Sequence, residues 1–315
     1  PSFYLFAGIG LYVVCALAVM ARYEWNPSIL VRFGAVYVEA NAGYTPQGSV
    51  QLVGNEEWGG NGYDGQIFYY YARTLFEDGW PEGFSKAYRA PRIGYPLLAA
   101  PFVVFGSWGV LYGLIVVQLV LFGISVHLLA TWLPPERRYF AIFYIVSPFA
   151  LQSFVLLVSD SVVASLLLIG TILWQRETQR PLFFAWLCFS LALLAKESAL
   201  FLLFPLGLFT LVEKKYARAA IMVATLLPFF LWQAYLRTVH GMVPASILTI
   251  FLMPLDGVQG LLAEGWGWLS QLGREPPLSF ILQGFKLSAR FLLLLLIFVS
   301  LALAIRPPFR QGWAL

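Results

Sequence analysis

Long apolar runs separated by short polar turns dominate the chain. A helix rises 1.5 Å per residue, so about 20 apolar residues cross the roughly 30 Å hydrocarbon core of a bilayer. The runs predict an all-α polytopic membrane protein with about eight transmembrane helices. These are expected at residues 3–21, 109–132, 140–157, 162–174, 182–195, 200–212, 219–236 and 287–305.

Several of the expected spans are short. The runs at 162–174, 182–195 and 200–212 meet at Asp160 and at Lys196-Glu197. Short helices are tolerated where they line a cavity. We therefore expect a water-filled cavity in one leaflet at these residues.

A long polar loop, residues 22–107, follows the first run. From Asp64 to Asp78 the apolar residues recur at spacings of three and four, which predicts an amphipathic helix along the membrane interface. Residues 93–105 are too short to cross easily and contain Pro96 and Pro101, so they predict a second interfacial or re-entrant helix. A later loop between Leu236 and Leu287, with Trp266 and Trp268, predicts another interfacial helix or a sugar-stacking surface.

Charge divides the loops into two kinds. Cytoplasmic loops retain Lys and Arg, which indicates that one set of turns is cytoplasmic: those with Arg137, Arg138, Arg176, Arg180, Lys214, Lys215, Arg218, Arg306 and Arg310. The loops with Asp64, Asp160 and Lys196-Glu197 then lie on the outer side. We expect two parts, a transmembrane module at 1–240 and an outer loop with the last span at 241–315.

Composition supports the membrane class. The chain is 60% hydrophobic and 11% charged, with a mean hydropathy of +0.75. Its net charge of +4 lies mostly in the predicted cytoplasmic turns, where anionic lipids account for it, so no nucleic-acid partner is expected. Cys15 and Cys188 both lie in apolar runs, which argues against a disulfide framework or a zinc site.

Two outer acids are candidate catalytic residues. Asp64 lies between Gly62 and Gly65 at a predicted helix start, which favours its ionised form and suits a general base. An acid such as Asp160 within a membrane helix is costly unless it reaches a polar cavity or the helix end. Helix capping is the structural alternative for both residues.

Other outer charges are candidate ligand contacts. Arg89 and Arg92 break the charge rule and could grip an anionic headgroup with paired hydrogen bonds, or serve as interfacial anchors. Lys196-Glu197 either holds a phosphate or sugar or forms a neutralised turn. Glu56 and Glu57 are weak candidates for a divalent cation site.

The order of these motifs resembles the outer loops of GT-C fold glycosyltransferases. The resemblance covers roughly residues 1–240 and is closest to uncharacterised bacterial members, more distantly to GPI and protein O-mannosyltransferases. It is carried by Tyr63-Asp64-Gly65-Gln66, the stretch from Arg89 to Pro96, Ser159-Asp160-Ser161 and Ala195-Lys196-Glu197-Ser198. The Lys196-Glu197 pair departs from relatives that carry Arg in that turn.

The resemblance implies an inverting transferase that moves a sugar from a polyprenyl-phosphate donor to a lipid, glycan or protein hydroxyl. The active site would lie on the outer face of a bacterial inner membrane. Asp64 would be the base, and Asp160 would position the acceptor or sugar. Residues assigned to substrate binding are Arg89, Arg92, Tyr95, Lys196, Glu197, Arg237 and His240, with Lys286 and Arg290 as further cations.

Two other classes stay open. A transporter or lipid flippase should show inverted repeats with charges near the bilayer midplane, whereas the charges here cluster at one face. A non-catalytic subunit of a membrane complex need not hold Asp64 and Asp160 near one another. Motifs of soluble nucleotide- and zinc-dependent enzymes are absent from the sequence. Its two histidines, His127 and His240, argue against a histidine-rich metal site.

Overall fold

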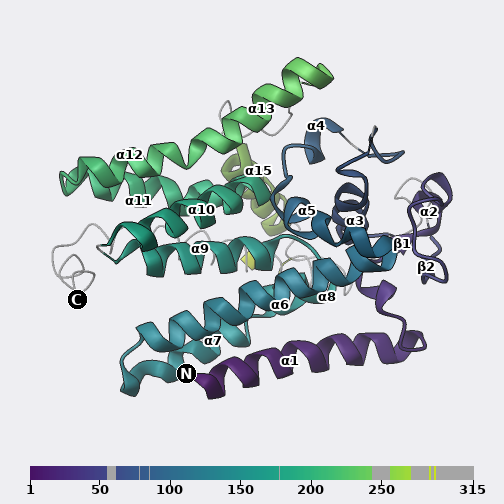
Figure 1. Cartoon of the computed structure of the whole chain (residues 1–315), viewed down its shortest axis with the longest axis horizontal. Coiled ribbons are helices and arrows are strands. Elements are labelled where there is room, and N and C mark those ends of the chain that lie inside the picture. Colours follow the sequence, from purple (N-terminus) through teal and green to yellow (C-terminus); the bar gives the residue numbers. More distant parts are fainter. Residues whose placement is uncertain are drawn as a thin grey trace. The chain divides into compact units, whose positions relative to one another are not determined.

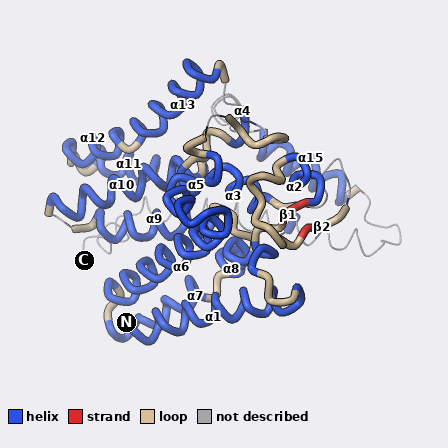
Figure 2. Tube along the Cα trace, turned by 45° about the vertical axis from the view of Figure 1, so that its right-hand side comes forward, coloured by secondary structure: helices blue, strands red, loops and turns tan. Residues whose placement is uncertain are grey.

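The computed structural model describes most of the chain as helix. The described residues are 1–54, 62–77, 79–84, 86–176, 178–242 and 256–270, together with 284, 287 and 288. Helices and loops make up nearly all of the trace in Figure 2, and the strands among the described residues are the short segments β1 (Phe33–Gly34) and β2 (Gln51–Leu52). The chain divides into two compact units, Pro1–Ser246 and Ile247–Leu315, and each is described by itself.

Long apolar helices form the first unit (Figure 1). α1 (Ser2–Met20) and α6 (Gly106–Trp132) pack against each other, as do α6 and α9 (Asp160–Trp174), and α9 and α10 (Gln179–Ala195). α11 (Leu200–Val212), α12 (Tyr216–Ala224) and α13 (Leu226–His240) follow. Because their side chains are apolar around much of each helix, the buried faces form one core and the remaining faces stay exposed and apolar, as lipid-facing surfaces do.

Seven of the eight expected spans fall on helices, and the eighth, 287–305, lies outside the described residues except for 287 and 288. Within the described part, three helical stretches are long and apolar enough to cross a membrane: Ser2–Tyr23, Gly94–Trp132 and Tyr216–His240. A further pair bent by 48° joins Pro135–Ile145 to α8 (Pro148–Val155) and includes α7 (Ala141–Ile145). These helices define a membrane protein, but eight spans are not confirmed, because α9, α10 and α11 are shorter than a bilayer core requires.

The segment after α1 is compact and irregular. It contains two 3-10 turns, η1 (Ala21–Tyr23) and η2 (Pro27–Leu30), and α2 (Ala35–Ala40). Two short strands, β1 (Phe33–Gly34) and β2 (Gln51–Leu52), pair in parallel with Phe33 opposite Gln51. The predicted amphipathic helix is present as α3 (Asp64–Thr74), and α4 (Lys86–Arg89) comes after it.

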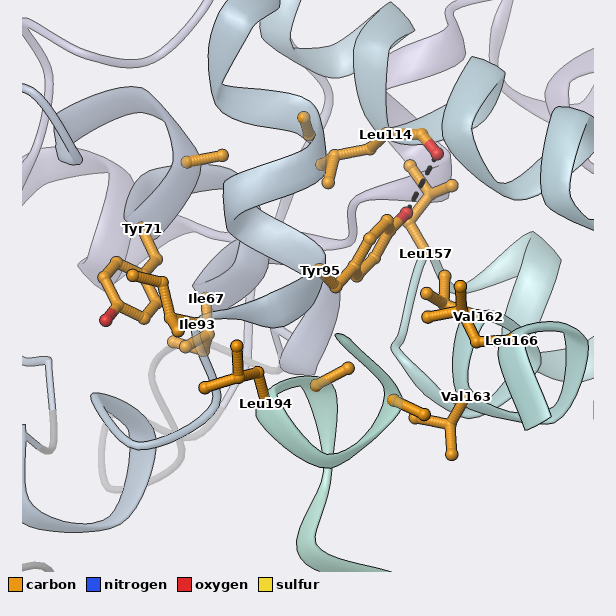
Figure 3. Packing of buried hydrophobic residues seen from close by; sticks show 14 of the residues in the cluster. Ile67, Tyr71, Ile93, Tyr95, Leu114, Leu157, Val162, Val163, Leu166 and Leu194 are labelled. Carbon is orange, nitrogen blue, oxygen red and sulfur yellow. Dashed lines mark hydrogen bonds between the residues drawn. The ribbon is translucent and has the colours of Figure 1, made fainter. Parts of the chain in front are cut away.

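The segment expected to be interfacial or re-entrant folds back on α6. It consists of α5 (Gly94–Ala99) and the 3-10 helix η4 (Ala100–Phe105). The Tyr95 hydroxyl donates to the Leu114 carbonyl at 3.0 Å (Figure 3), although one straight helix would place these residues about 28 Å apart. The reversal occurs at Gly106, whose φ of 75° is readily adopted only without a Cβ.

A buried polar network joins these helices. The Gln118 amide nitrogen donates to the Tyr95 hydroxyl at 2.8 Å and to the Val158 carbonyl at 3.0 Å. Its amide oxygen accepts the Ser161 hydroxyl at 2.6 Å. Because buried polar groups need partners, this network sets how α5, α6 and the start of α9 pack together.

The second unit contains the described helix α15 (Asp256–Leu269). A helix is therefore present in the predicted outer loop, and its Trp266 side chain is exposed. An exposed tryptophan on a partly apolar helix is typical of membrane-interface anchors.

Candidate functional site

Basic turns and candidate site residues lie at opposite ends of α9. At its C-terminal end the Trp132 indole donates to the Gln175 side chain at 2.7 Å, and Arg218 donates to the Arg176 carbonyl at 3.3 Å, so the ends of α6 and α9 and the start of α12 meet. Asp160 begins the helix at the other end. Its 15 residues separate the two ends by about 22 Å.

Three ion pairs form the candidate site. Arg89 Nη2 lies 3.5 Å from Asp64 Oδ1, Arg92 Nε lies 3.0 Å from Glu197 Oε2, and Lys196 Nζ lies 2.6 Å from Asp160 Oδ1. The pairs are linked by the backbone, because the Arg92 N–H donates to the Arg89 carbonyl and Lys196 precedes Glu197. We call these six residues the charge chain.

Two glycines allow the elements of the charge chain to approach. A Cβ on Gly65 would lie 2.7 Å from the Val31 carbonyl oxygen and would also overlap the Leu156 carbonyl, in the turn that leads to Asp160. A Cβ on Gly94 would lie 2.6 Å from the Leu191 carbonyl oxygen in α10. Such distances are too short for any other residue, so these contacts require glycine. They bring Asp64 toward the start of α9, and Arg92 toward Glu197.

The middle pair of the charge chain is buried. The Glu197 side chain is 4% exposed and the Arg92 side chain is 19% exposed. Burial acts to lower the pKa of Arg92, but the Glu197 carboxylate and Tyr88 outweigh it and raise the pKa above the ordinary value. Tyr88 also lies under the guanidinium, 4.2 Å from ring centre to Cζ. Arg92 is therefore a fixed cation that holds the segment between α4 and α5 against the turn between α10 and α11.

The two outer acids are exposed and do not cap their helices. The side chains of Asp64 and Asp160 are 62% and 52% exposed. The capping positions are held by Tyr63 and Ser159, and the Ser161 N–H at the start of α9 is satisfied by the Ser153 hydroxyl at 2.8 Å. Capping alone therefore does not explain why acids occupy these positions. Each carboxylate does interact favourably with the positive N-terminal end of the helix that it begins.

A small pocket opens beside Asp64. Its free volume is about 20 Å³, enough for about one water molecule. Arg89 contributes a buried Nη1 that has no hydrogen-bond partner within the described residues. The pocket is lined by Asp64, Ile67, Phe68, Tyr71, Tyr88, Arg89 and Arg92.

The loop between the two arginines is anchored by aromatic side chains. The Tyr71 hydroxyl and the Trp232 indole both donate to the Ala90 carbonyl, at 2.9 and 2.8 Å. Burial raises the pKa of Tyr71, so this hydroxyl stays a donor at neutral pH. Arg89 and Arg92 are therefore held on either side of a fixed carbonyl.

The remaining predicted residues have different placements. Tyr95 is fully buried between helices, and its hydroxyl donates to the Leu114 carbonyl and closes the fold-back; its predicted substrate contact stays a prediction. His240 packs edge-on against Trp80 at 5.3 Å, and Trp80 in turn contacts Tyr71, behind the pocket. Arg237 is exposed and makes no ion pair or hydrogen bond within the described residues.

The candidate metal ligands Glu56 and Glu57, and the cations Lys286 and Arg290, lie outside the described residues. Where the structure describes the chain, no group of three or more His, Cys, Asp and Glu side chains is placed to hold a metal ion.

Sequence reasoning missed the aromatic half of the pocket. Tyr71 belongs to the apolar repeat between Asp64 and Asp78, and Tyr88 directly precedes Arg89. Their signal was weak, because aromatic residues at helical spacing usually indicate core packing.

No protein-family model, curated protein or solved structure matches this chain. The fold and the site define a class: a helical membrane protein with basic turns at one end of its helices and a chain of paired charges at the other.

Proposed function

We propose that this protein is a membrane glycosyltransferase of the GT-C type. It would move a sugar from a polyprenyl-phosphate donor to a hydroxyl of a lipid, glycan or protein on the outer face of the membrane. The observation that carries the proposal is the pairing of two exposed helix-starting acids, Asp64 and Asp160, with basic side chains at the end of α9 opposite the basic turns.

Asp64 is the proposed general base. It is exposed, it begins α3, and Arg89 lies beside it, so the carboxylate is accessible to an acceptor hydroxyl. A positioned base contributes about 10² to 10⁴ in rate by taking the proton of the attacking hydroxyl. Asp160 is the proposed contact that orients the acceptor or the sugar.

Arg89 and Lys196 are the proposed phosphate contacts. Both are paired with exposed acids, and exposed ion pairs contribute only about 0 to 1 kcal/mol, so a phosphate can displace the acids at little cost. The unpartnered Arg89 Nη1 is a ready donor for the leaving phosphate, where negative charge grows in the transition state. Arg92 and Glu197, being buried and tightly paired, position the loops.

The pocket must open for this chemistry. Its present volume of about 20 Å³ is far smaller than the 300 to 1,000 Å³ of typical ligand sites. Breaking the Asp64–Arg89 ion pair would separate two residues that line the pocket and would enlarge the pocket. The aromatic walls formed by Phe68, Tyr71 and Tyr88 then suit a ligand with both apolar and polar faces.

The test measures sugar release by the purified full chain from radiolabelled polyprenyl phosphates that carry a hexose or a pentose. Wild type should turn over at least one donor, and Asp64→Asn should lose about 10² or more of that rate. Glu213→Gln is the matched control, because it removes an acid from another surface ion pair, with Lys215.

Equal rates for wild type and Asp64→Asn would refute the base assignment. No turnover of any donor by folded wild-type protein would refute the transferase and favour a non-catalytic subunit.

A further inference from the structure

A second cavity lies at the end of α1. Its volume is about 410 Å³, far more than that of the pocket beside Asp64. It is open enough and large enough to admit a headgroup-sized molecule. The lining residues are Ala18, Val19, Arg22, Tyr23 and Arg32.

Among the described residues, the two arginines of this cavity have no anionic partner. Neither side chain makes an ion pair or a hydrogen bond with any described residue, and the neighbouring Glu24 pairs with neither of them. Arg32 Nε is moreover buried and has no hydrogen-bond partner in the described part of the chain. A buried donor left unsatisfied is costly and uncommon, so an acceptor brought against the Arg32 guanidinium from the cavity would relieve that cost.

The backbone holds Arg32 in place. Its φ of 59° is unusual for a residue with a side chain, and its carbonyl accepts the Tyr63 N–H at 3.0 Å. The side chain therefore projects from a turn that is tied to the start of α3. Such fixed placement lowers the cost of ordering an arginine around a ligand.

The position of the cavity along α1 indicates which part of a lipid bilayer lies beside it. Ser2–Tyr23 is apolar enough to cross a membrane, and the cavity is lined by its last turn. Tyr23 and the exposed Trp25 follow, as aromatic residues do at the level of lipid headgroups. The two guanidinium groups, unpaired among the described residues, therefore lie at the level where headgroup phosphates are expected.

We propose that the cavity formed by Arg22, Tyr23 and Arg32 binds a phosphate group, from a phospholipid headgroup or from a free phosphate. The planar guanidinium fork matches the oxygens of a phosphate and forms paired, charge-assisted hydrogen bonds. The structural alternative for Arg22 is a favourable interaction with the C-terminal end of α1. It does not account for the buried and unpartnered Arg32 Nε.

The test is native mass spectrometry of the full chain in detergent, titrated with phosphatidylglycerol or with phosphatidylcholine. Wild type should retain phosphatidylglycerol in preference. Arg32→Gln and Arg22→Gln should each weaken that binding about tenfold, which corresponds to about 1.4 kcal/mol. Arg180→Gln, which removes an exposed arginine at the start of α10, should leave it unchanged.

Inorganic phosphate added as a competitor distinguishes the two sources. Displacement of phosphatidylglycerol would show that free phosphate suffices, and retention would assign the site to a lipid headgroup. Equal binding by wild type and both glutamine variants would overturn the proposal. Circular dichroism checks that Arg32→Gln is folded. If it is not, the affinities of the exposed Arg22→Gln and the charge-preserving Arg32→Lys for phosphatidylglycerol are measured instead. Unchanged affinity in both variants would overturn the proposal.

Discussion

Replacing Arg92 by Met should destabilise the protein far more than breaking a surface pair. The change leaves the Glu197 carboxylate, which is 4% exposed, without its cation. Removing one partner of a buried ion pair costs about 3 to 5 kcal/mol, because the remaining charge is desolvated and unpaired. Lys215→Met breaks the pair with Glu213, whose side chains are 52% and 35% exposed, and should cost less than about 1 kcal/mol.

The assay is thermal unfolding of the detergent-purified chain, followed by circular dichroism. At about 2 to 4 °C per kcal/mol, Arg92→Met should lower the apparent Tm on the order of 10 °C, and Lys215→Met by only a few degrees. The double variant Arg92→Met, Glu197→Gln should recover part of the loss, because the uncompensated charge is gone.

Equal Tm values for Arg92→Met and Lys215→Met would refute this reasoning. They would show that the Glu197 carboxylate reaches water or another cation once Arg92 is removed. A double variant no more stable than Arg92→Met would separately show that the unpaired charge is not the source of the loss.

Three further predictions concern packing and hydrogen bonding. Gly94→Ala should lower the apparent Tm by the equivalent of about 1 to 3 kcal/mol, because the added methyl group overpacks the contact with α10. Gly10→Ala is the control and should not lower the Tm, because the space around that position is open. Equal Tm values for the two variants would contradict the close approach to α10. Gln118→Leu should cost about 1 to 3 kcal/mol by thermal unfolding, because it leaves the buried Ser161 hydroxyl without its acceptor, and no loss would mean that the network is not needed. Tyr71→Phe should cost about 1 kcal/mol by removing one of two bonds to the Ala90 carbonyl, and unchanged melting would indicate that the remaining bond suffices.

Some of the candidate site could be predicted from residue order. Asp64 and Asp160 each begin a helix, as the change from polar to apolar spacing indicated. For Lys196-Glu197 the sequence left open a neutralised turn or a contact to a phosphate or sugar, and in the structure each residue pairs with a distant one. In this turn the nearest opposite charge along the chain is therefore not the partner in the ion pair that forms.

Other features had no usable sequence signal. Arg22 and Arg32 lie in a loop whose path depends on left-handed residues, and their shared cavity exists only because that path returns to α1. Tyr95 lay in a stretch rich in charge, yet the reversal at Gly106 turns it into the core. Burial of this kind is set by neighbours that are remote in sequence.

The sequence by itself determined that the chain is a helical membrane protein, because apolar runs of bilayer length have few other stable forms. It also determined where the principal helices begin and which turns are basic. Only the tertiary structure decided which charges meet: Arg92 and Glu197 are 105 residues apart, and Lys196 and Asp160 are 36 apart. The physical reason is that such pairs depend on close backbone contacts, as at Gly94 against α10 beside Arg92, and no local pattern encodes which surfaces will touch.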